Sequence, residues 1–164
     1  MNTNHKSILY NKLLSLSRNI FFYKEIKLPD SFETRIYLMF FHFSILMIIF
    51  KKKGSKFDQK KYDYFFHNIE YNLRESGLGD VAVNKKMKEF NKILYDILLK
   101  IDLEIKNKNK FKLNHNLISK YFNELKDNNS AEFGQFETYL TNFFYFCFEH
   151  SLDNMIENSD KFKL

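Results

Sequence analysis

Residue types that could carry catalysis or bind a metal are present, but they are scattered along the chain. The five histidines form no His-x-x-x-His pair, and no Glu-x-x-His pair occurs, so the pattern that binds metal ions in helical bundles is missing. Adjacent aspartates, which a Mg²⁺-dependent enzyme would need as clustered carboxylates, are also missing. His42 lies in an apolar segment, which favours a hydrogen-bonded core histidine over a metal ligand. The sequence therefore predicts a protein that is not an enzyme, with no catalytic residue, metal site, cofactor or small-molecule substrate.

Two further features could suggest chemistry, and each has a structural interpretation. Gly77-Leu78-Gly79-Asp80 resembles a phosphate-binding loop, but it has no third glycine and no preceding strand, and the Asp80 carboxylate would repel phosphate. We interpret it as a tight turn between two helices. Cys147 is the single cysteine and lies in an aromatic segment, which predicts a buried, reduced thiol in a cytosol-like compartment.

Arginine is rare, and its positions are therefore informative. Of the 26 basic residues, all but Arg18, Arg35 and Arg74 are lysine. A guanidinium presents a planar fork of donors where lysine presents a point charge. We infer that these three positions need the fork, and we expect them to fix helix junctions by pairing with carboxylates such as Asp30 and Asp80.

The charge is unevenly distributed. Residues 1–112 contain 22 basic and 12 acidic residues, whereas residues 113–164 contain 4 basic and 8 acidic residues. This asymmetry indicates a polyanionic partner for the first part, either nucleic acid or an anionic membrane surface, but the sequence gives no support for sequence-specific recognition and we expect no DNA partner. A lysine-rich surface that only faces water is the alternative. The densest lysine clusters are Lys51, Lys52, Lys53, Lys56, Lys60 and Lys61, and Lys85, Lys86, Lys88 and Lys92.

The first half of the chain predicts two helices and a break between them. Apolar residues from Ile8 to Ile20 recur at spacings of three and four, which is typical of an amphipathic helix. Leu28-Pro29-Asp30 breaks the pattern, and Asp30 followed by Glu33 predicts the N-cap of a second helix. In residues 36–50 only His42 and Ser44 are polar. At ~1.5 Å per residue this segment is too short for a hydrocarbon core of roughly 30 Å, so we expect a central buried helix. The alternative is that part of its surface is a hydrophobic site for a client.

The remaining segments predict four more helices. Asp58 caps a third helix, with Phe57 and Tyr62 placed for a hydrophobic staple, and Gly77 ends it. Asp80 or Asn84 starts a fourth helix, which a polar connection at 106–112 ends. Asn114 caps a short fifth helix, and Ser130 caps a long last helix that reaches about Ile156. We therefore predict an all-α fold over residues 1–164, a compact single-domain bundle of about six helices with acidic C-terminal helices at 113–157.

Two spaced sequence blocks resemble the ubiquinol–cytochrome c chaperone family. The first block contains Arg18, Phe22-Tyr23, Leu28-Pro29-Asp30-Ser31, Arg35 and an apolar helix with His42. The second is Leu73-Arg74-Glu75-Ser76-Gly77-Leu78-Gly79-Asp80, followed by Val83 and a lysine cluster. The resemblance covers about residues 10–101 and includes all three arginines. Phe41 before His42, Ser31 and Asn84 depart from the family pattern, and residues 102–164 match only as helical.

The resemblance implies a binding role in the assembly of respiratory complex III. It implies a chaperone that holds newly made cytochrome b or another complex III subunit, located in the cytoplasm at the inner membrane, or in the mitochondrial matrix in a eukaryote. A bacterial member is expected. In mitochondrial relatives the role goes with the ribosome exit region and a small partner protein. The alternative is a ribosome- or RNA-binding module without a specific client. The residues that we expect to be structural or to bind the client are Arg18, Phe22, Tyr23, Pro29, Asp30, Arg35, His42, Leu73, Arg74, Gly77, Gly79 and Asp80.

Overall fold

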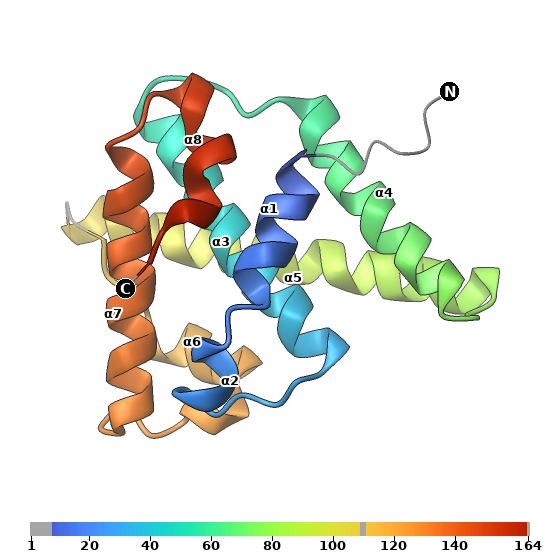
Figure 1. The fold of residues 1–164 in the computed structure, drawn as a ribbon, viewed down its shortest axis with the longest axis horizontal. Coiled ribbons are helices and arrows are strands. Elements are labelled where there is room, and N and C mark those ends of the chain that lie inside the picture. Colours follow the sequence, from blue (N-terminus) through green and yellow to red (C-terminus); the bar gives the residue numbers. More distant parts are fainter. Residues whose placement is uncertain (1–7, 109–110, 164) are drawn as a thin grey trace.

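The regular elements of the protein are helices throughout the described part of the chain. The computed structural model describes residues 8–108 and 111–163, with side chains described for 8–102 and 111–163. The α-helices are α1 (Ile8–Ser17), α2 (Phe21–Lys24), α3 (Phe32–Lys52), α4 (Gln59–Glu75), α5 (Asp80–Lys108), α6 (His115–Tyr121), α7 (Ala131–Phe148) and α8 (Leu152–Asn158). Two 3-10 helices, η1 (Asn123–Leu125) and η2 (Ser159–Lys161), follow α6 and α8. The predicted all-α fold is confirmed (Figure 1).

Helix α3 forms the centre of the structure. It packs against α1, α5 and α7, and all of its residues from Ile36 to Ile49 except Tyr37 and Met47 are buried. By length and composition α3 could cross a membrane, but 72% of its most apolar window is buried within the protein. The central buried helix was therefore predicted correctly. The alternative, a client site on part of the surface of this helix, stays a prediction, although most of its apolar side chains are covered by other helices.

The N-cap of α3 differs from the prediction. Ser31, not Asp30, caps the helix, because the Ser31 Oγ accepts a hydrogen bond from the Thr34 amide at 3.2 Å. The Asp30 carboxylate does not cap the helix and instead forms an ion pair with Arg35. A serine directly after an aspartate offers two adjacent capping oxygens, and the sequence alone did not distinguish them.

The α4–α5 hairpin follows the expected local chemistry. Asp58 accepts a hydrogen bond from the Lys60 amide, and the rings of Phe57 and Tyr62 both pack against Phe43. Gly77 has a φ of +93°, as expected for the residue after a helix C-cap. Helix α5 starts at Asp80, one of the two predicted positions, but it continues to Lys108, into the segment predicted as a polar connection.

The long last helix is divided into two. Ser130 caps α7 as predicted, by accepting a hydrogen bond from the Phe133 amide at 3.1 Å, but the helix ends at Phe148. The chain then folds back so that α8 packs against α1 and α7. The break places Met155 and Ile156 in the core, and the burial of these apolar side chains stabilises the reversal.

The interior is strongly aromatic. Phe22, Phe41, Phe136 and Phe143 are fully covered and lie where α2, α3 and α7 meet. Cys147 is also buried, and burial raises the pKa of its thiol to about 12, so the expected buried thiol is confirmed. All buried apolar residues belong to a single cluster, in which α3 is the common partner of the surrounding helices.

Candidate functional site

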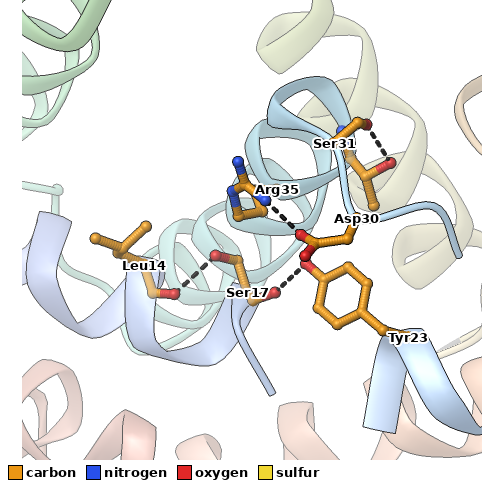
Figure 2. A network of polar contacts seen from close by, with 7 residues as sticks. Leu14, Ser17, Tyr23, Asp30, Ser31 and Arg35 are labelled. Atoms are coloured by element: carbon orange, nitrogen blue, oxygen red, sulfur yellow. Dashed lines mark hydrogen bonds and ion pairs between the residues drawn. The ribbon is translucent and has the colours of Figure 1, made fainter. Parts of the chain in front are cut away.

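The first sequence block forms the junction between α1, α2 and α3. The Tyr23 hydroxyl donates a hydrogen bond to the Ser17 carbonyl at 2.6 Å, and the Ser17 hydroxyl donates to the Leu14 carbonyl at 2.7 Å (Figure 2). These bonds satisfy carbonyl groups at the open end of α1 and connect them to α2. Phe22 is fully buried beside them. In this Phe-Tyr pair, Phe22 therefore belongs to the core and Tyr23 forms the hydrogen bond at the junction.

Two arginines, Arg18 and Arg35, lie on the exposed side of this junction. The Arg35 guanidinium donates to the Asp30 carboxylate at 2.5 Å, and the two side chains are 30% and 74% exposed (Figure 2). Arg18 is exposed and has no side-chain hydrogen bond or ion pair among the described residues. Ile20, two residues further along the chain, is 60% exposed. We call Arg18, Ile20, Asp30 and Arg35 together the junction surface.

An open groove adjoins the junction surface. It has a volume of 440 Å³ and lies between the end of α1 and the C-terminal segment. Its lining combines apolar and polar side chains, from Ser15, Leu16, Asn19, Phe21, Asp160, Phe162 and Lys163. A groove of this kind can accept an apolar side chain of a partner while polar groups at its edge bind the partner's backbone.

Tyr10 connects the first block to the second. Its hydroxyl accepts a hydrogen bond from the Asn72 amide of α4. Burial raises the pKa of Tyr10, while the Asn72 hydrogen bond and the positive charges of Arg18 and Arg35 act to lower it. Both guanidinium groups therefore lie within electrostatic range of the contact between α1 and the end of α4.

The second block forms the α4–α5 turn. Arg74 and Asp80 form an ion pair across this turn, and Leu73 anchors it because its side chain is buried. Gly77 supplies the left-handed backbone, whereas Gly79 has an ordinary φ and open space around it. The structure thus places two of the three arginines in ion pairs with the expected aspartates, one at each block. Whether these residues contact a client stays a prediction.

His42 lies in the core, away from both ion pairs. A carbonyl can only accept, so the His42 Nδ1–H donates to the Leu38 carbonyl at 2.6 Å. The Nε2 atom then accepts from the Tyr139 hydroxyl at 2.9 Å. The ring is fully buried and packs edge-on against Phe22 and Phe143. Burial lowers the pKa of His42 to about 4, so the imidazole is neutral and structural near pH 7.

The family model described as Ubiquinol-cytochrome C chaperone matches residues 24–141. The chain belongs to this family. Membership implies a ubiquinol–cytochrome c chaperone role. No curated protein and no solved structure matches the chain.

The match covers most of the chaperone, from the end of α2 to the middle of α7. It includes Pro29, which is exposed in the α2–α3 connection, and the Arg35–Asp30 and Arg74–Asp80 pairs. Arg18, Phe22 and Tyr23 precede the matched range, and the Phe22 ring contacts the rings of His42 and Phe136 within it. At its other end the match extends beyond the resemblance at residues 10–101, into helices that the sequence linked to the family only as helical.

Sequence reasoning missed two features of this chaperone. Tyr139 was not predicted as the partner of His42, because a contact between α3 and α7 leaves no local sequence pattern. Lys27, in the α2–α3 connection, has a φ of +65°, and only glycine or asparagine at this position would have signalled it. Within the described side chains, no group of three or more His, Cys, Asp or Glu residues is placed to hold a metal ion.

Proposed function

We propose that this protein is a non-catalytic assembly chaperone that binds newly made cytochrome b of ubiquinol–cytochrome c oxidoreductase. It acts at the cytoplasmic side of the inner membrane, or the matrix side in a mitochondrion. The observation that carries the proposal is the family match across residues 24–141, which contains both arginine–aspartate pairs. A rigid helical scaffold with exposed binding residues at its helix junctions suits a protein that holds a client.

We place the client contact at the junction surface and its groove. Arg18 has no partner among the described residues, so its guanidinium can bind client carbonyl or carboxylate groups bidentately without first breaking an ion pair. Ile20 is exposed beside it and offers an apolar contact. The client segment that fits this chemistry is the end of an apolar helix, where apolar side chains adjoin unsatisfied backbone carbonyls.

Cross-linked capture of tagged protein from native membranes tests the proposal. Enriched cytochrome b, identified by mass spectrometry, is the expected result. Arg18→Glu should reduce capture on the order of tenfold, corresponding to ~1.4 kcal/mol. Lys56→Glu is the matched control, because Lys56 is also exposed and undergoes the same charge reversal at a distant loop. Absence of cytochrome b from the wild-type capture would contradict the proposal, and equal losses in the two variants would contradict the assigned surface.

One observation favours a second function, binding to ribosomal RNA. The outer face of α4 alternates basic and aromatic side chains, at Lys60, Tyr64, His67, Tyr71 and Arg74. Tyr64 and Tyr71 are 55% and 60% exposed and could stack on bases. Under this alternative, capture would enrich ribosomal proteins without cytochrome b, and RNA affinity would fall steeply with salt.

A further inference from the structure

Helix α5 has an outer face that no helix of the described structure covers. Residues 81, 85, 88, 92, 95 and 99 are all exposed, and their spacing of three and four places them on a single stripe. We call these residues the α5 stripe, which consists of Val81, Lys85, Lys88, Lys92, Tyr95 and Leu99. Over its 18 steps the stripe is about 27 Å long.

The ends of the stripe are apolar and its middle is basic. Val81 is 85% exposed, and Tyr95 and Leu99 are each 60% exposed. Leu78, in the preceding turn, is 39% exposed and extends the apolar end. Large apolar side chains exposed on one face of a helix, together with lysines, are typical of a surface that contacts a partner.

The positive charges of the stripe are not neutralised by the protein. Lys85, Lys88 and Lys92 form no ion pair with any described residue. The acidic groups beside them have other partners. Glu89 pairs with Lys86 at 3.9 Å, and Asp96 binds Lys100 and Lys120, both at 2.9 Å.

The position of α5 suits contact with an extended surface. Figure 1 shows this helix crossing the molecule along its longest axis, behind α1 and α3. Its inner side packs on α3 and α4, so the stripe faces away from the core. A partner that meets the whole stripe therefore presents a surface at least about 27 Å long.

From these observations we infer that the α5 stripe binds an anionic lipid bilayer, with α5 lying in the plane of the membrane interface. Lysine side chains can reach phosphate headgroups while Val81 and Leu99 enter the upper acyl region. A tyrosine is well suited to the interface between them. RNA explains the lysines but not the exposed aliphatic side chains, which have no ring to stack on bases. The inference rests on the membrane location proposed above, and it names the α5 stripe as the face that contacts the membrane.

Vesicle binding of the full chain tests the charge of the stripe. The vesicles are phosphatidylcholine alone or with phosphatidylglycerol, and binding is measured by co-sedimentation. The triple variant K85Q/K88Q/K92Q should lose on the order of 100-fold in affinity for the anionic vesicles. The matched control K56Q/K60Q/K61Q, which removes the same charge from exposed lysines elsewhere, should lose much less.

A fluorescence measurement tests the position of the stripe. The chain contains no tryptophan, so Tyr95→Trp introduces a single reporter on α5, and Tyr64→Trp introduces one at an exposed position of α4. Anionic vesicles should shift the emission of the α5 reporter to shorter wavelength and leave that of the α4 reporter unchanged. Circular dichroism shows whether each variant keeps its helical fold.

Three outcomes would overturn the inference. The first is an equal loss of vesicle affinity in the two triple variants. The second is a blue shift of the α4 reporter only. The third is unchanged vesicle binding of K85Q/K88Q/K92Q together with lost RNA binding. These experiments contain no cytochrome b. A negative result would therefore contradict the binding of the α5 stripe to the membrane. It would not affect the proposed capture of cytochrome b, which is tested separately.

Discussion

His42 shows at the scale of one residue how burial makes stability depend on pH. Burial lowers its folded-state pKa to about 4, below the value of about 6.5 expected in the unfolded chain. As the pH falls below 6.5 the unfolded chain takes up this proton first, so stability is present above that pH and is lost on acidification.

We predict that the free energy of unfolding decreases by about 2 kcal/mol between pH 7 and pH 5. Chemical denaturation at the two pH values measures this change, over a range in which most carboxylates stay ionised. His67→Asn is the control for the loss of a histidine outside the core, because His67 is exposed. A wild-type protein equally stable at both values would show that His42 is not buried as described.

The Arg74–Asp80 pair leads to a different expectation, because both side chains are largely exposed, at 42% and 82%. Exposed ion pairs contribute little to stability, so Arg74→Lys should change the unfolding free energy by less than ~1 kcal/mol. If client capture nevertheless falls in this variant, the guanidinium acts in recognition. A much larger loss of stability would instead support the role in fixing the helix junction.

At the scale of the residue, the sequence indicated which side chains have a structural role, but it did not indicate which residues far apart in the chain contact each other. Three arginines in a lysine-rich chain signalled special positions, and two of them pair with the expected aspartates. The His42–Tyr139 hydrogen bond joins residues 97 positions apart, and no local spacing encodes such a contact.

At the scale of the elements, two glycines with different backbone conformations allow a comparison of the same substitution, glycine to alanine. Gly77 has a φ of +93°, which disfavours any side chain, whereas Gly134 lies on the exposed side of α7 with open space around it. Gly77→Ala should lower the unfolding free energy by about 1 kcal/mol, and Gly134→Ala should raise it by about 0.5–1 kcal/mol. Thermal or chemical denaturation measures both. Effects of the same sign would contradict either the left-handed conformation of Gly77 after α4 or the helical position of Gly134 within α7.

Helix boundaries were predictable where a polar cap defines them and uncertain elsewhere. Asp58, Asn114 and Ser130 each accept the expected backbone hydrogen bond. The break between α7 and α8 was missed because it depends on the burial of Met155 and Ile156 in the folded protein. The C-terminal end of α5 was missed because a lysine- and asparagine-rich segment can also be the polar continuation of a helix.

At the scale of the whole molecule, the most apolar helix supports the structure, and its apolar side chains are largely covered by other helices. The apolar side chains of α3 are covered mainly by α1, α5 and α7, so the client and membrane contacts that we propose lie on other elements and on Arg35 near the start of α3. The composition of this helix predicted its central place in the fold. It could not predict which outer faces remain free, because that depends on how all the helices pack together.

The central claim is that this protein binds cytochrome b through the junction surface. The most direct test is site-specific photo-cross-linking in native membranes, with the photoreactive residue placed at Ile20 or, as the control, at Tyr145. Both side chains are exposed, at 60% and 45%, but Tyr145 lies on α7. We expect a cross-link to newly made cytochrome b from position 20 and none from position 145. A cytochrome b adduct from Tyr145 alone would contradict the assigned surface, and none from either position would contradict the claim itself.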